Sequence, residues 1–194
     1  MFAYVLPALS YLLGSLSTGV IVARLFGLPD PRATGSKNPG ATNLLRYGGK
    51  LVAVLTLTGD ILKGVIAILV ARAFTDDTAT LALVGFAVFI GHLWPVFFGF
   101  HGGKGVATAL GVWLAINPWV GLSLTVTWLA MAVLFRYSSL SALAAAVAAP
   151  LYVYLLMPQP AYLAMMVAMS ALLVFRHRVN IQRLLAGTET KIGH

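Results

Sequence analysis

Long apolar stretches separated by short polar breaks constrain this chain more than any other feature of its sequence. A membrane interior about 30 Å thick is crossed by roughly 20 apolar residues in a helix. The 194-residue chain is 60% hydrophobic and only 9% charged, and such stretches recur from end to end. We therefore predict an all-α, polytopic membrane protein that forms a single integral-membrane domain over residues 1–194.

Seven transmembrane helices are predicted from the positions of the breaks, which are rich in proline, glycine and aspartate. The helices cover residues 3–26, 51–74, 79–99, 105–117, 119–135, 139–157 and 161–176. The fourth is short for a full span, so we expect it to tilt or to begin in the interface. The first has no basic region before it and no clear cleavage site, so we expect a retained helix rather than a signal peptide.

The basic residues predict the orientation of the helices. Seven passes place nearly all of these residues on one side of the membrane. They are Arg24, Arg32, Lys37, Arg46, Lys50, Lys104, Arg136, Arg176, Arg178, Arg183 and Lys191. The opposite side holds Arg72 beside Asp76 and Asp77. Because basic loops stay in the cytoplasm, we predict an outside N-terminus and a cytoplasmic C-terminus.

Three polar segments, residues 35–46, 101–108 and 176–191, then share the cytoplasmic face. The net charge of +8 could suggest nucleic acid, but a membrane bundle has no soluble basic face to present. Anionic lipid headgroups and phosphorylated substrates are the better partners. The sequence contains no cysteine, which excludes disulfides, thiolate metal sites and cysteine nucleophiles.

The first segment combines turn residues with hydrogen-bonding side chains. Its glycines and Asn-Pro pair favour tight turns whose backbone N–H groups form a nest for an anion. Ser36 adds a hydroxyl, and Arg46 a planar fork that matches phosphate. The phosphate-binding candidates beside them are Gly35, Asn38, Gly40, Thr42 and Asn43. On composition alone, a loop with helix caps and a lipid-facing arginine is an equal alternative.

The second segment, His-Gly-Gly-Lys-Gly-Val-Ala-Thr, runs directly into an apolar helix. Glycines before a helix N-terminus expose backbone N–H groups, and the helix dipole adds positive charge, so the segment suits phosphate. It is not a Walker A loop, which needs a glycine where Phe98 stands. A flexible turn with a snorkelling lysine is the alternative. The candidates here are Gly102, Gly103, Lys104, Gly105 and Thr108.

The third segment places His177 and Asn180 three residues apart, on one face of any continuing helix, where they can address one ligand together. Its arginines are interpreted as the cytoplasmic membrane anchor. Glu189 is its only acid, and a structural salt bridge is the expected role.

Two ionisable residues, Asp60 and Lys63, fall inside the second predicted helix. Such groups are costly in a membrane and normally pair inside the bundle, so we predict a structural ion pair. A proton or ion path is the alternative. His92, near the end of the third predicted helix, is interpreted as a packing or interface residue.

Several catalytic patterns are absent from the sequence. No histidine is followed four residues later by aspartate, so the His-x4-Asp acyltransferase dyad is missing. There is no Gly-x-Ser-x-Gly elbow, and histidines and carboxylates are too few for a di-metal hydrolase. The chemistry should therefore need little acid catalysis, which favours a substrate with a good leaving group. No metal or organic cofactor is expected.

Taken together, the motifs resemble the bacterial acyl-phosphate:glycerol-3-phosphate acyltransferase family (PlsY). The resemblance rests on residues 35–46, on 102–108, on His177-x-x-Asn180 with Glu189, on Asp60-x-x-Lys63-Gly64 and on Gly91-His92-x-x-Pro95. It implies a seven-helix inner-membrane enzyme with a cytoplasmic active site. Such an enzyme transfers the acyl group of a fatty acyl phosphate to the 1-hydroxyl of glycerol 3-phosphate. The products are lysophosphatidic acid and phosphate, in the first acylation of bacterial phospholipid synthesis.

The resemblance also implies roles for single residues. Ser36 and Arg46 would be needed for activity, the glycine loop would bind glycerol phosphate, and the downstream glutamate would be structural. From their chemistry we expect Arg46 and Lys104 to clamp phosphates, and Ser36 and Asn180 to orient the substrates. The hydroxyl proton would pass to His177 or to a substrate phosphate oxygen, and the sequence favours the phosphate because no carboxylate is available to orient the histidine.

Two rival functions stay open at this point. An organophosphate or anion transporter would place Asp60 and Lys63 on a midplane path, although the chain shows no inverted repeat and no polar motif on its outer face. An enzyme that uses acyl-CoA on the same acceptor is disfavoured by the missing His-x4-Asp dyad. The sequence leaves acyl-chain preference and oligomeric state open.

Overall fold

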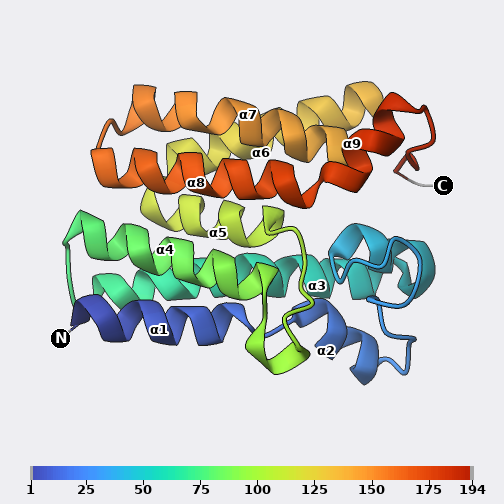
Figure 1. Cartoon of the computed structure of the whole chain (residues 1–194), viewed down its shortest axis with the longest axis horizontal. Coiled ribbons are helices and arrows are strands. Elements are labelled where there is room, and N and C mark those ends of the chain that lie inside the picture. The colour runs from blue at the N-terminus through green and yellow to red at the C-terminus, as the bar shows by residue number, and fades with distance from the viewer. Residues whose placement is uncertain (1, 193–194) are drawn as a thin grey trace.

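The computed structural model describes residues 2–192, and over this range the chain is all-helical, as predicted (Figure 1). The elements are α1 Phe2–Gly14, α2 Thr18–Leu25, α3 Ala41–Arg72, α4 Thr78–Leu93, the 3-10 turn η1 Val96–Phe98, α5 Val106–Ile116, α6 Pro118–Phe135, α7 Ser138–Leu156, α8 Pro160–Arg176 and α9 Arg178–Leu185.

Five segments of the described chain are long and apolar enough to cross a membrane, and a sixth follows if the bent pair α8 and α9 counts as one span. The pair bends by 57°. The remaining predicted span corresponds to α5, which has 11 residues. At 1.5 Å per residue α5 is only about 16 Å long, roughly half the hydrocarbon thickness.

The predicted first helix, 3–26, is two helices in the structure, because the chain leaves helical geometry after Gly14. A Cβ on Gly14 would lie 2.1 Å from the backbone oxygen of Val88, so α1 and α4 touch backbone to backbone here. The break frees the carbonyl of Leu16, which accepts a hydrogen bond of 3.1 Å from Lys63 Nζ.

Helix α3 begins ten residues before the predicted position 51. Its first two turns were interpreted as loop because they hold the polar residues of the first segment. They are separated from the apolar part by Gly49, whose φ of 81° and ψ of 179° interrupt the helix. This backbone conformation is open essentially to glycine alone. The kink lets residues 41–48 turn away from the membrane-spanning part while they remain helical.

The third predicted helix, 79–99, ends earlier than expected. Helix α4 stops at Leu93, and Pro95 then leads into η1, because proline disfavours helical geometry in the residue before it. The glycine loop, residues 99–105, follows and enters α5.

Helices α6, α7 and α8 lie along one side of the bundle, and α1, α3 and α4 along the other, with α5 between them (Figure 1). Phe89, Trp113 and Tyr162 pack in the core between α4, α5 and α8. Apolar side chains also face outward, and Val133 is 78% exposed. Such a large exposed apolar surface is expected of a protein whose solvent is lipid.

Candidate active site

A cavity of about 430 Å³ opens between the two sides of the bundle and brings together parts of all three polar segments. The first segment contributes residues of the loop before α3 and of its first two turns. The second contributes the loop before α5, and the third contributes the joint of α8 and α9 with the tail beyond. The sequence candidates that line this cavity are Ser36, Asn38, Gly40, Thr42, Asn43, Arg46, Asp60, Lys104, Gly105, His177, Asn180 and Glu189.

Two helix N-termini face the cavity without a side chain to cap them. Gly40 is the N-cap of α3 and Gly105 is the N-cap of α5, and both line the cavity. In the described part of the chain, no acceptor is bonded to the backbone N–H groups of residues 104–108. Free N–H groups and the positive end of a helix dipole form a ready anion site, so the cavity presents two such sites.

Asn43 shapes the first of these sites. Its side chain is buried, its Oδ1 accepts a 2.9 Å hydrogen bond from the N–H of Ser36, and its Nδ2 donates to the carbonyls of Pro31, Thr34 and Asn38. Because these protein groups occupy its amide, Asn43 holds the turn that presents Ser36.

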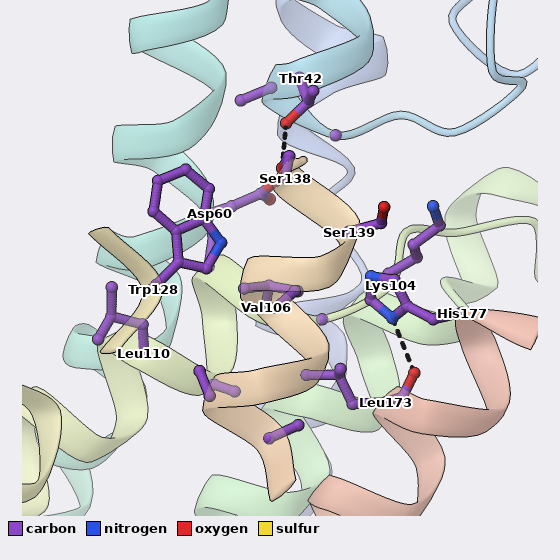
Figure 2. A pocket seen from close by; sticks show the side chains of 18 of the residues that line it. Thr42, Asp60, Lys104, Val106, Leu110, Trp128, Ser138, Ser139, Leu173 and His177 are labelled. Atoms are coloured by element: carbon purple, nitrogen blue, oxygen red, sulfur yellow. Dashed lines mark hydrogen bonds between the residues drawn. The ribbon is translucent and has the colours of Figure 1, made fainter. Parts of the chain in front are cut away.

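Gly35 and Thr42 complete this region. The φ of Gly35 is +60°, and a Cβ there would lie 2.3 Å from Asn43 Oδ1, so only glycine fits. Thr42 shares a 3.0 Å hydrogen bond with Ser138 at the start of α7 (Figure 2). This bond joins the two sides of the bundle across the cavity.

Lys104 anchors a chain of hydrogen bonds in the cavity wall. Its Nζ donates to Asn180 Oδ1 at 2.6 Å, and Asn180 Nδ2 donates to Glu189 Oε1 at 2.7 Å. Ser139 Oγ donates to the same carboxylate oxygen at 2.7 Å. In the described chain Glu189 thus makes hydrogen bonds in place of the predicted salt bridge, and it orients Asn180 toward Lys104.

The charge of Lys104 is weakened by its surroundings. Burial lowers the pKa of its ammonium to about 8, and the arginines nearby add to that effect, while Glu189 opposes it. Lys104 is therefore mostly protonated at neutral pH but titrates close to it.

His177 is buried where α8 meets α9. Its Nδ1 lies 2.8 Å from the carbonyl oxygen of Leu173, and since a carbonyl only accepts, Nδ1 carries the proton (Figure 2). This leaves Nε2 as the ring nitrogen available to a ligand. The backbone carbonyl of Leu173 thus orients the imidazole. The sequence offered no carboxylate for this role.

Three candidates from the second polar segment lie behind the cavity lining. The carbonyls of Gly102 and Gly103 accept hydrogen bonds from the guanidinium of Arg176. Thr108 is fully buried, and a Cβ on Gly64 would lie 2.4 Å from its backbone oxygen. Arg176 thus holds Gly102 and Gly103 from behind, and Thr108 packs against α3, while Lys104 and Gly105 line the cavity.

Sequence reasoning missed three contributors. Arg176 and Arg183 were interpreted as membrane anchors, but Arg176 holds the glycine loop and Arg183 lines the cavity. Ser139 was predicted as the first residue of the helix 139–157, with no part in the site. The only available signal was a pair of serines at the start of α7, and serine is common at helix starts for reasons unrelated to catalysis.

The predicted ion pair of Asp60 and Lys63 is present, with 2.9 Å between Lys63 Nζ and Asp60 Oδ1, and both side chains are 4% exposed. Asp60 and His92 also line the inner wall of the cavity. Among residues 2–192, no three side chains of histidine, aspartate or glutamate gather as metal ligands.

The deeper wall of the cavity is apolar. Helix α7 turns a row of alanines toward it, and α5, α6 and α8 add large apolar side chains. These residues are Ala142, Ala145, Ala146, Ala149, Leu110, Trp128 and Met166. The cavity thus has a cationic mouth rich in N–H groups and an apolar interior. The protein is of the class of helical membrane proteins with a site suited to an anionic, lipid-like ligand.

Comparison with known proteins gives the family. The family model described as glycerol-3-phosphate acyltransferase matches residues 4–187. A glycerol-3-phosphate acyltransferase of Methylococcus capsulatus is 56% identical over 190 residues, covering 98% of this chain and 96% of that one. The corresponding protein of Thioalkalivibrio sulfidiphilus is 56% identical over 185 residues, with 95% and 91% covered.

Solved structures agree. The crystal structure of PlsY (YgiH), an integral membrane glycerol 3-phosphate acyltransferase, in its glycerol 3-phosphate form superposes with a TM-score of 0.94 at 44% identity, covering 98% of this chain and 96% of that one. Its lysophosphatidic acid form gives 0.91 at 43% identity, with 98% and 95% covered. This chain belongs to the glycerol-3-phosphate acyltransferase family of integral membrane proteins, as its motifs predicted.

Proposed function

We propose that the protein transfers the acyl group of a fatty acyl phosphate to the 1-hydroxyl of glycerol 3-phosphate, which yields lysophosphatidic acid and inorganic phosphate. The observation that carries the proposal is the pair of uncapped helix N-termini at one cavity mouth. Each suits one phosphate group, and the apolar cavity below them suits an acyl chain. Glycerol 3-phosphate and lysophosphatidic acid name the two forms of the solved relative.

An acyl phosphate fits a site with little acid catalysis, because phosphate is a good leaving group. The hydroxyl oxygen of glycerol 3-phosphate attacks the acyl carbonyl carbon, and the bond from that carbon to the bridging oxygen breaks. Phosphate leaves with the electron pair. Arg46 and Lys104 would offset its developing charge, and the helix N-termini would fix both phosphates in place.

The hydroxyl proton must also be received. We assign it to an oxygen of a substrate phosphate, and we assign to His177 Nε2 a hydrogen bond that orients the reacting groups. In this scheme His177→Gln, which keeps a hydrogen-bonding side chain, retains more turnover than His177→Ala. Equal and near-complete loss in both variants, together with loss of a kinetic pKa, would instead make His177 the base.

We further propose seven passes, with the N-terminus outside and the active site facing the cytoplasm of the bacterial inner membrane. The proposal is supported by the gathering of basic residues at the end of the bundle that holds α2, α9 and the cavity mouth. Residues 1–194 would then form a single integral-membrane acyltransferase domain, with membrane lipid and the two substrates as its partners.

The test is a comparison of acyl donors with the purified protein. Glycerol 3-phosphate is supplied with either palmitoyl phosphate or palmitoyl-CoA, in the presence of a chelator. Lysophosphatidic acid from the acyl phosphate alone supports the proposal, and product from the CoA ester alone would make this an acyl-CoA enzyme.

A further inference from the structure

A buried polar cluster lies in the cavity wall beneath the glycine loop. It consists of Asp60, Lys63 and His92, whose side chains are 4%, 4% and 7% exposed. His92 Nδ1 lies 3.4 Å from Asp60 Oδ1, the oxygen that also lies 2.9 Å from Lys63 Nζ. Lys63 Nζ donates to the carbonyl of Leu16 as well. The cluster thus joins α3, α4 and the break between α1 and α2.

His92 contacts the glycine loop with both its backbone and its ring. The N–H of Gly103 donates to the carbonyl of His92 at 3.1 Å. A Cβ on Gly103 would lie 2.2 Å from His92 Nε2 and 2.9 Å from Cε1, so the imidazole packs directly against the Gly103 α-carbon. The residue that follows, Lys104, faces the cavity.

The same loop is held from α8 by Arg176. Its Nη2 donates to the carbonyls of Gly102 and Gly103, each at 2.9 Å, and its guanidinium lies 5.6 Å from the centre of the Trp94 ring. The position of the loop is therefore fixed between a cation from α8 and the imidazole from α4.

The charge balance of the cluster matters because Asp60 lines the cavity that would hold two phosphates. An unpaired carboxylate there would repel them, whereas Lys63 neutralises it. His92 in turn lies against the carboxylate, so its ring position depends on that pair.

We propose that Asp60, Lys63 and His92 are positioning residues for the glycine loop. Through the His92 ring they set the position of Gly103, and so of Lys104 and of the free N–H groups at the start of α5. The inference rests on the proposed function and assigns the cluster a part in substrate binding, beyond that of a structural ion pair.

The first test measures kcat and both KM values for His92→Ala and His92→Gln. The control is Tyr11→Phe, which removes the 2.9 Å hydrogen bond to the carbonyl of Trp94 at the same end of α4, and within the described chain the Tyr11 side chain makes no hydrogen bond to the loop. We expect His92→Ala to raise KM for one phosphorylated substrate about tenfold or more, since a displacement near 1 Å can be that costly. The KM for the other substrate should change less than about twofold. In His92→Gln the raised KM should return part of the way to the wild-type value.

A binding readout separates this inference from the proposed reaction. Glycerol 3-phosphate and inorganic phosphate are each titrated against thermal unfolding of the purified variants. A smaller ligand-induced rise in Tm for His92→Gln than for Tyr11→Phe supports positioning, whatever the acyl donor. Wild-type protein that fails to transfer acyl groups would reject only the proposed function.

Charge neutralisation gives the second test. Lys63→Met leaves the carboxylate unpaired and should raise KM for phosphorylated substrate more than the double variant Asp60→Asn/Lys63→Met does. Two results would overturn the inference. One is KM values in the His92 variants equal to those of Tyr11→Phe. The other is a parallel change of both KM values that follows the loss of Tm, which would indicate packing alone.

Discussion

The polar side chains at the cavity mouth are of two kinds. Some are hydrogen-bonded to other protein groups, and others are free to bind a ligand. Asn43, Asn180 and Glu189 use their polar atoms within the protein. Arg46 lines the cavity, and in the described part of the chain its guanidinium makes no hydrogen bond or ion pair. A planar cation beside a helix N-terminus and without a partner is available to a phosphate group.

Removal of the Arg46 side chain should therefore impair substrate binding and turnover, and it should change the stability of the protein very little. We expect Arg46→Ala to lower kcat/KM on the order of 100-fold, because it deletes a charge-assisted contact to phosphate at the mouth of the cavity. Arg46→Lys should recover only part of this, since lysine lacks the planar fork. The control is Lys50→Ala, an exposed cation four residues further along and beyond the kink at Gly49. Near-normal activity in Arg46→Ala would remove the phosphate clamp.

The pKa of Lys104, lowered to about 8, predicts a pH dependence. The protonated lysine attracts phosphate, and it loses its charge as pH rises through that value. We therefore expect kcat/KM to fall above about pH 8, because kcat/KM reports the free enzyme. In Lys104→Arg the falling limb should move to higher pH, and an unmoved limb would show that another group titrates.

Ser139 offers a test of the hydrogen-bond chain behind Lys104. Ser139→Ala removes one donor to Glu189, which should let Asn180 and Lys104 shift and lower kcat/KM about tenfold, the cost of about one charged hydrogen bond. Ser141→Ala is the matched control, since that hydroxyl donates only to the carbonyl of Tyr137. Equal activity in the two variants would contradict the chain.

The sequence predicted cavity-lining side chains whose chemistry is distinctive. It missed those whose part in the candidate site depends on where the fold places them. Few side chains can bind a phosphate group or hydrogen-bond to a ligand beside it. This is why the sequence predicted Arg46, Lys104, His177 and Asn180. Nothing in the sequence distinguishes Ser139 from other serines at helix starts, or Arg176 from an ordinary membrane anchor, because their roles depend on contacts across the fold.

At the scale of elements, the kink of α3 decides where the first polar segment lies. Gly49 has open space around it, so a methyl group would meet no neighbour, and only the backbone conformation is at stake. Gly49→Ala should lower the free energy of unfolding by about 1–3 kcal/mol. It should also reduce turnover, because a straighter α3 moves Arg46.

The measurement is thermal unfolding together with kcat/KM, and Ala53→Gly is the control for a change of helix propensity in the same helix. A Gly49→Ala protein with wild-type stability and turnover would show that the kink is not needed.

Apolar periodicity predicted the existence of helices better than their ends. The break at 15–17 lies inside an apolar run and depends on tertiary contacts. The Gly48-Gly49 pair did mark an interruption, but nothing in the sequence showed that the polar residues before it are helical. The early end of α4 was signalled by Pro95, but the Phe-rich run beyond it resembles helix continuation.

At the scale of the whole molecule, orientation can be tested directly because the sequence has no cysteine. Single cysteines at Asp76 and Gln159 should react with an impermeant maleimide added to intact cells. Cysteines at Lys37 and Thr188 should react only after the membrane is opened. The reverse pattern would invert the proposed topology, and labelling of all four from outside would reject it.

The central claim is that this bundle transfers the acyl group of an acyl phosphate by cleavage of the carbon–oxygen bond. The most direct measurement uses palmitoyl phosphate with ¹⁸O in its bridging oxygen, together with glycerol 3-phosphate and purified protein. The account predicts one ¹⁸O in each released phosphate and an equal amount of unlabelled lysophosphatidic acid, with both formed about 100-fold more slowly by Arg46→Ala. Label in free palmitate, or no lysophosphatidic acid from the wild-type protein, would contradict it.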